Sequence, residues 1–192
     1  TAEAHRRIMV VEVMGRYAGW IALHAGVAGG ADVILIPEIP YDLDKVAACI
    51  RERDDWGARF SIVVVAEGAR PAGGSVSVVR EARGTRPERL GGAGIHVAGE
   101  LETRTGKESR YVVLGHLQRG GAPTPFDRTL ATRFGGKAVE LVLAGQFGVM
   151  VANHPPDIVA VPLGEVVGKT RTVPLDYDLI TTARALSVSF GD

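Results

Sequence analysis

The sequence has few of the features that mark a secreted, membrane or nucleic-acid-binding protein. Its single cysteine, Cys49, cannot form a disulfide within the chain. Every apolar run is shorter than the roughly 18 residues that a membrane-spanning helix needs. The 22 basic residues are balanced by 22 acidic ones, whereas nucleic-acid-binding domains usually carry a basic excess. We therefore expect a soluble, cytoplasmic protein whose partners include neither a membrane nor a nucleic acid.

Motifs for cofactors and metals are missing as well. The chain contains no GxGxxG pattern and no P-loop, and His5, His24, His96 and His154 lack the spacing of metal ligands. We expect no metal site within this chain. The sequence begins at Thr1 and enters an apolar run almost at once, which is unlike a signal peptide. We therefore expect that an N-terminal part of the protein is missing from it.

Short apolar runs rich in β-branched residues alternate with segments of helical period. The runs cover residues 8–13, 33–36, 60–66, 111–114 and 158–163. The helical segments cover residues 17–27, a stretch capped by Asp42, residues 95–103 and a long stretch that begins at Thr124-Pro125. Because the runs scarcely alternate in polarity, they predict strands buried on both faces of a largely parallel sheet. The expected fold class is α/β, with a Rossmann-like sheet.

One stretch breaks this rhythm. Residues 68–94 are rich in glycine, proline and arginine and contain a single weak strand candidate at 76–79. Such a composition is typical of irregular structure. We expect an excursion from the sheet there.

The stretch "VVLGHLQRGGAPTPFDR", residues 112–128, places polar side chains directly after a predicted strand. His116, Gln118 and Arg119 would lie at the carboxyl end of that strand, where open α/β sheets bind their ligands. Two glycines follow them and allow close approach of the backbone, and a helix N-terminus adds N–H groups. This combination suits a phosphate group. A plain polar turn is the alternative.

Two further runs end in charged residues. "VVEVMGRYAGW" places Gly15 and Arg16 after the run 8–13, and "VVVAEGA" places Glu67 after the run 60–66. Cations for a phosphate and a carboxylate that accepts hydrogen bonds from hydroxyl groups together indicate a sugar-phosphate pocket. The alternative is that Arg16 and Glu67 simply pair with each other.

Taken together, these stretches resemble a known protein family. "VVEVMGRYAGWIALHAGVAGGADVILIPE", "VVVAEGA" and "TGKESRYVVLGHLQRGGAPTPFDRTLATRFGGKA" resemble the fructose-6-phosphate half of bacterial 6-phosphofructokinases, in the style of actinobacterial members. The resemblance extends from Thr1 to the C-terminus. It implies phosphoryl transfer to the 1-hydroxyl of fructose 6-phosphate, a step of glycolysis, with this chain supplying the acceptor site.

The resemblance also implies roles for individual residues. The turn formed by Met14, Gly15 and Arg16 would contact the sugar phosphate, and Arg16 would act in catalysis by stabilising charge on the moving phosphoryl group. Glu67 would hold sugar hydroxyls. The acceptor site would be completed by the loop after residue 114, which contains His116, Leu117, Gln118 and Arg119, with His116 and neighbouring arginines gripping the 6-phosphate.

Two more arginines match family positions that reach the 6-phosphate from an adjacent subunit. They are Arg7 and Arg110, each close to the start of a predicted strand. Without the resemblance, each would be interpreted as a solvated arginine beside a strand. With it, we expect a homo-oligomer, a tetramer or a dimer, in which Arg7 and Arg110 act across an interface.

The resemblance divides the chain into two parts. Residues 1–120 would form the fructose-6-phosphate-binding α/β domain, and residues 121–192 would supply C-terminal helices and a strand that return to a missing donor-binding domain. The phosphoryl donor, ATP or pyrophosphate with Mg²⁺, would bind on that missing part, so this chain alone would be inactive. The competing interpretation is a sugar-phosphate sensor without chemistry, which would need no donor domain.

Overall fold

The structure is a computed structural model that describes residues 1–80 and 89–192. The chain divides into two units, unit 1 with Thr1–Arg119 and Arg171–Asp192, and unit 2 with Gly120–Thr170. The boundary that we expected at residue 120 lies beside this division. The final segment, Arg171–Asp192, packs with unit 1. The return of residues 121–192 to a donor-binding domain stays a prediction. Residues 81–88, part of the predicted irregular excursion, lie outside the described residues.

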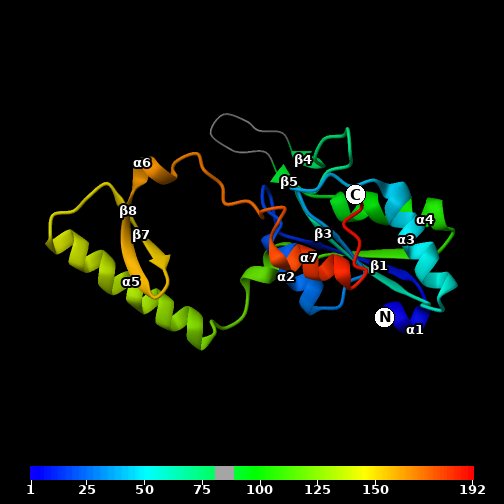
Figure 1. Cartoon of the computed structure of the whole chain (residues 1–192), viewed down its shortest axis with the longest axis horizontal. Helices are drawn as coiled ribbons and strands as arrows, with labels where there is room; N and C mark the ends of the chain where they lie inside the picture. The colour runs from blue at the N-terminus through cyan, green and yellow to red at the C-terminus, as the bar shows by residue number, and fades with distance from the viewer. Residues whose placement is uncertain (81–88) are drawn as a thin grey trace. The chain divides into compact units, whose positions relative to one another are not determined.

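Unit 1 contains a four-stranded sheet with the strand order β2-β3-β1-β6, and every neighbouring pair in it is parallel (Figure 1). The α/β fold with a parallel sheet is therefore confirmed. The elements of unit 1 are α1 (Ala2–His5), β1 (Ile8–Val13), α2 (Trp20–Ala28), β2 (Val33–Leu35), α3 (Leu43–Asp55), β3 (Ser61–Ala66), β4 (Val78–Arg80), β5 (Arg89–Leu90), α4 (Ala93–Thr105), β6 (Ser109–Val113), the 3-10 helix η1 (Gly115–Arg119) and α7 (Asp178–Ala185). Strands β4 and β5 pair separately and antiparallel.

Helices cover both faces of this sheet. On one face, a Cβ atom added to Gly26 of α2 would lie 2.6 Å from the side chain of Ile34, so the glycine lets the helix approach β2 closely. On the other face, Gly94 in the first turn of α4 donates its N–H to the buried Glu12 of β1 at 2.8 Å. Helices α3 and α4 lie side by side (Figure 1). As predicted, Asp42 caps α3, since its side chain accepts from the N–H of Asp44.

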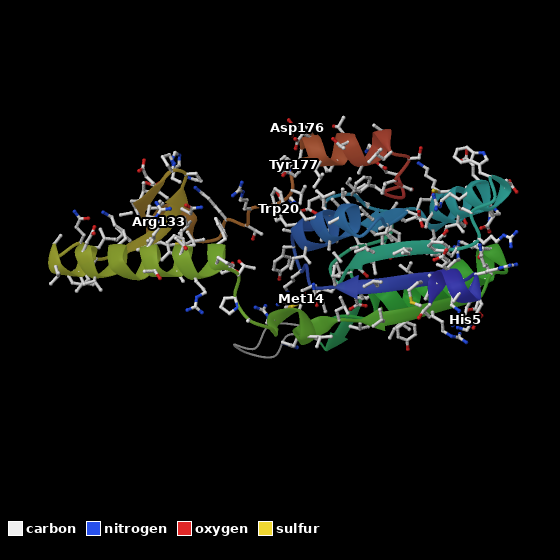
Figure 2. All side chains as sticks on the ribbon, turned by 90° about the horizontal axis from the view of Figure 1, so that it is seen from below. His5, Met14, Trp20, Arg133, Asp176 and Tyr177 are labelled. Carbon is white, nitrogen blue, oxygen red and sulfur yellow. The ribbon has the colours of Figure 1, made fainter. Side chains whose placement is uncertain are left out.

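The last residues of the chain are held on unit 1 by several contacts. The N–H of Val173 donates to Glu38 at 2.7 Å, and the indole N–H of Trp20 donates to the carbonyl of Arg171 at 2.8 Å. Trp20 and Tyr177 lie side by side with ring centroids 5.4 Å apart (Figure 2). Ser189 then bridges to Val33 at the edge of the sheet. Neither the packing of this segment on unit 1 nor α7 was predicted from the sequence.

Two strand predictions need correction. The run 111–114 forms most of β6, but Tyr111 and Val113 are about half exposed because β6 is an edge strand and not one buried on both faces. The run 158–163 forms β8 (Asp157–Pro162), which pairs antiparallel with β7 (Val149–His154) in unit 2 and does not join the parallel sheet. A hairpin pairs its strands locally, so β8 needs no place in the parallel sheet.

Unit 2 consists of this hairpin and helices α5 (Pro125–Leu143) and α6 (Leu163–Val166). Thr124 caps α5 as predicted, and it forms a full capping box with Asp127. Within the described parts of the chain, no helix has both the length and the apolar character needed to cross a membrane.

Candidate functional site

Three strands of unit 1 end side by side at one edge of the sheet. Strand β1 lies between β3 and β6, and the register of both pairs brings their carboxyl ends together. Neighbouring strands in a sheet lie about 4.8 Å apart. The loops that begin with Met14, Glu67 and Leu114 are therefore neighbours in space, as the sequence predicted.

Hydrogen bonds connect these loops. The N–H of Met14 donates to the side-chain oxygen of Gln118 at 2.7 Å, which joins the turn after β1 to helix η1. The N–H of Gly15 lies 3.5 Å from Glu67 Oε1, which joins the same turn to the loop after β3. The turn after β1 is thus held from both sides.

Gly68, which was not predicted to belong to the site, supports the same turn. The N–H of Gly68 donates to the carbonyl of Gly15 at 3.0 Å, and a Cβ atom at position 68 would lie 1.9 Å from the carbonyl oxygen of Arg16. No side chain fits there without moving the turn. The signal in the sequence is the glycine that directly follows Glu67 in "VVVAEGA".

Two of these loops carry the side chains of Arg16, His116 and Arg119. Arg16 is half-buried, and its guanidinium carbon lies 5.3 Å from the centre of the Tyr17 ring. His116 and Arg119 lie on η1 and are exposed. Leu117, between them, is 76% exposed and packs little against the unit. At this edge, the side chains of Arg16, His116 and Arg119 lie on loops adjacent to the loop that carries the carboxylate of Glu67.

Arg7 and Arg110 lie elsewhere. Residue 7 immediately precedes β1 and residue 110 is opposite Met9 in the register of β6, so both lie at the amino ends of their strands. Figure 2 shows His5 and Met14 near opposite ends of β1. At about 3.3 Å per residue, the seven residues from Arg7 to Met14 span about 23 Å. Within one chain, the structure does not bring these two arginines to the site.

The sequence of the chain is similar to the sequences of known proteins. The sequence profile described as Phosphofructokinase matches residues 1–142. The chain belongs to the phosphofructokinase family. It is 55% identical over its whole length to an ATP-dependent 6-phosphofructokinase of Chloroflexus aurantiacus, and 54% identical over 92% of its length to a pyrophosphate–fructose 6-phosphate 1-phosphotransferase of Amycolatopsis mediterranei. In each case the chain spans only 52% of the relative.

Solved phosphofructokinase structures share the fold. The pyrophosphate-dependent phosphofructokinase of Marinobacter aquaeolei superposes with a TM-score of 0.73 at 26% identity, over 91% of this chain and 45% of that one. The phosphofructokinase of Saccharomyces cerevisiae gives a TM-score of 0.71 at 37% identity, over 85% of this chain and 20% of that one. This phosphofructokinase chain thus corresponds to a part of its longer relatives.

The described residues do not fit a metal or donor site. Within residues 1–80 and 89–192, no group of three His, Cys, Asp or Glu side chains could hold a metal ion. The sequence also lacks a glycine-rich phosphate loop.

Proposed function

We propose that this chain supplies the fructose 6-phosphate site of a 6-phosphofructokinase, which transfers a phosphoryl group to the 1-hydroxyl and forms fructose 1,6-bisphosphate in glycolysis. The observation that carries the proposal is the hydrogen-bonded junction of the loops after β1, β3 and β6, in a chain of this family. The enzyme names of the relatives favour a kinase over a sensor module. A glycolytic role would place the protein in the cytoplasm.

The roles proposed for the residues follow from the needs of phosphoryl transfer. The reaction requires alignment of the acceptor and positive charge where negative charge develops, with little covalent help from the protein. His116 and Arg119 would bind the 6-phosphate, which is already present on the sugar, and Glu67 would accept hydrogen bonds from sugar hydroxyls. Arg16 would face the phosphoryl group during its transfer. The turn at Met14 and Gly15 would contact the sugar phosphate and fix its position.

The position of Arg7 and Arg110 supports an interface role. Along β1, Arg7 lies about 23 Å from the turn at Met14, and Arg110, which is opposite Met9, lies about 17 Å from it. They would therefore serve the site of another copy rather than their own. A homotetramer or a homodimer would bring them there. Such a site would be complete only in the oligomer.

The donor belongs to the part of the relatives that this chain does not span. We assign ATP or pyrophosphate, with Mg²⁺, to that part, and we derive no step through the metal because no described group of residues fits it. Relatives named for ATP and for pyrophosphate are almost equally identical to the chain, at 55% and 54%. The identity of these residues therefore does not separate the two donors.

Replacing Arg119 tests the acceptor site. In the enzyme that contains this chain, Arg119→Ala should raise KM for fructose 6-phosphate by at least about tenfold, because a charged hydrogen bond to phosphate is lost. The KM for the donor should stay nearly unchanged. Steady-state kinetics with either substrate varied would measure both constants. Arg184→Ala is the matched control, because it removes an arginine of α7 that pairs with Asp192 and lies outside the proposed site. An unchanged sugar KM in Arg119→Ala would refute the assignment.

A further inference from the structure

One carboxylate touches both of the arginines at the amino ends of β1 and β6. Glu108 Oε2 lies 3.3 Å from Arg7 Nη2, and Glu108 Oε1 lies 2.5 Å from Arg110 Nη2. Each oxygen of the carboxylate thus faces a different guanidinium. Neither the resemblance nor the sequence pattern assigned a role to Glu108.

The sheet itself explains why these three side chains meet. In the register of β1 and β6, Ile8 is opposite Ser109 and Met9 is opposite Arg110, and the N–H of Ile8 donates to the carbonyl of Glu108 at 3.0 Å. Side chains two residues apart on a strand point to the same face. Arg7, Glu108 and Arg110 consequently project from the same face at the amino edge of the sheet.

The two guanidiniums are held to different degrees by the rest of the protein. The side chain of Arg7 is only 15% exposed, so packing restrains it, whereas that of Arg110 is 56% exposed. Two guanidiniums that approach each other repel, and an exposed arginine loses side-chain entropy when it is held in one rotamer. A carboxylate between them offsets the repulsion and restrains Arg110.

The ion pairs join Glu108 to a terminal nitrogen, Nη2, of each guanidinium. Arginine has five N–H donors in a planar fork. Arg110 Nη1 donates to the carbonyl of Ser109 at 3.3 Å and Arg7 Nε is buried, so the remaining N–H groups of the two side chains are the ones left for an anion. A phosphate group can accept hydrogen bonds from two such forks at once. The arrangement is therefore suited to present two arginines together to one phosphate.

We propose that Glu108 is a positioning residue, which holds Arg7 and Arg110 as a pair for the 6-phosphate bound by a second copy of the chain. The proposal rests on the proposed function, because it takes the two arginines as ligands of the sugar phosphate. It adds a residue that acts through them and does not touch the substrate.

The test compares variants of Glu108 in the enzyme that contains this chain. In Glu108→Gln, one side-chain oxygen can still face one guanidinium, but the amide nitrogen must face the other, so one arginine is released. We expect KM for fructose 6-phosphate to rise about three- to tenfold, with kcat changed by less than about twofold. Glu108→Asp keeps both carboxylate oxygens on a shorter side chain, so its KM for fructose 6-phosphate should lie between those of the parent enzyme and Glu108→Gln. Glu100→Gln on α4, which removes a carboxylate paired with Arg104, is the matched control.

A double-mutant cycle shows whether Glu108 acts through Arg110. In an Arg110→Ala background, Glu108→Gln should change the sugar KM by less than about twofold, because the arginine it would release is gone. Melting temperatures of all variants report whether a change in KM comes from unfolding. If Glu108→Gln fails to fold, the same cycle with Glu108→Asp gives the answer.

The outcomes separate this inference from the proposed function. If Arg7→Ala and Arg110→Ala raise the sugar KM while Glu108→Gln leaves it unchanged or lowers it, the positioning role is wrong and the acceptor site stands. If neither arginine variant changes KM, the interface assignment of the arginines fails, and the role of Glu108 fails with it. A full effect of Glu108→Gln in the Arg110→Ala background would also overturn the inference.

Discussion

At the scale of single residues, Arg16 and Arg119 should respond differently to replacement. Arg16 lies in the turn after β1, where its proposed catalytic contact is with the phosphoryl group in transit. Arg16→Ala should lower kcat by about a hundredfold or more and leave the sugar KM nearly unchanged, since the lost interaction exists mainly in the transition state. Steady-state kinetics would measure this, with Arg119→Ala as the contrasting variant. A change confined to sugar binding would show that Arg16 is only a substrate ligand.

Gly68 offers a residue-scale test of the turn that carries Arg16. A Cβ atom at position 68 would meet the carbonyl oxygens of Arg16 and Gly15, which are backbone atoms and cannot swing away. Gly68→Ala should therefore lower the free energy of unfolding by about 1–3 kcal/mol and reduce kcat as the turn shifts. Chemical denaturation and kinetics would measure the two effects.

Gly99→Ala is the control for this variant. A Cβ atom at Gly99 of α4 meets nothing within 4 Å, and alanine favours a helix interior over glycine by up to about 1 kcal/mol. The control should be as stable as the parent or more stable. Equal behaviour of the two variants would mean that the space around Gly68 is not restrictive.

At the scale of elements, the strands buried in the sheet were the most predictable. The runs that became β1, β2 and β3 are apolar except for Glu12 and Ser61, because helices cover both faces of the sheet there. Strand β7 was missed because its apolar run, residues 149–152, is only four residues long and is followed by the polar Asn153 and His154. Helix α7 was missed because its apolar face is small: its buried residues are Ile180 and Ala183.

The candidate site was predictable to the level of its loops but not of its contacts. A charged or polar residue directly after a buried strand can be recognised in the sequence, as at Arg16 and Glu67, because parallel strands end at a common edge. The bond between Met14 and Gln118 joins residues 104 positions apart. The contact of Glu108 with two arginines likewise depends on the register of β1 and β6. Register is set by three-dimensional packing, which a local pattern does not contain.

The start of α5 gives a prediction about an element. The side chain of Thr124 accepts from the N–H of Asp127, and the Asp127 carboxylate accepts from the hydroxyl and the N–H of Thr124. Thr124→Ala should lower the free energy of unfolding by about 0.5–2 kcal/mol, since the cap is lost. Thr132→Ala, on the exposed middle of the same helix, is the control and should cost little or nothing. Equal losses in both variants would contradict a special role for the cap.

The same capping box predicts a pH dependence. The hydrogen bonds from the Thr124 hydroxyl and N–H lower the pKa of Asp127 in the folded chain. A carboxyl group whose pKa is lower in the folded state stabilises the fold above its unfolded pKa, and this contribution is lost as the pH falls through the folded pKa. NMR titration of the Asp127 carboxyl carbon should show a lower midpoint in the parent than in Thr124→Ala. Identical midpoints would show that the hydrogen bonds do not form in solution.

At the scale of the whole molecule, the exposed apolar side chains predict how the isolated chain behaves. Within unit 2, Phe126, Leu143 and Phe147 are each more than two-thirds exposed. Large exposed apolar patches promote association. We expect the purified chain to form oligomers without a defined size, which light scattering would detect. The enzyme that contains this chain is the control and should give one defined assembly; a well-behaved monomer of the isolated chain would contradict the prediction.

The isolated chain should also be inactive. Under the proposed function it supplies residues for the acceptor only. It contains no phosphate loop, and its described residues contain no group of three that could hold a metal ion. Its Arg7 and Arg110 need a correctly placed second copy to complete a site. We therefore expect no turnover with ATP or pyrophosphate in a coupled assay, and at most weak binding of fructose 6-phosphate by calorimetry. Measurable turnover would show that the chain itself binds the phosphoryl donor, and the assignment of the donor site to the remaining part of the relatives would be wrong. Tight sugar-phosphate binding without turnover by a monomer would favour the sensor module, since a sensor needs His116, Arg119 and Glu67 but neither a donor nor a neighbouring subunit.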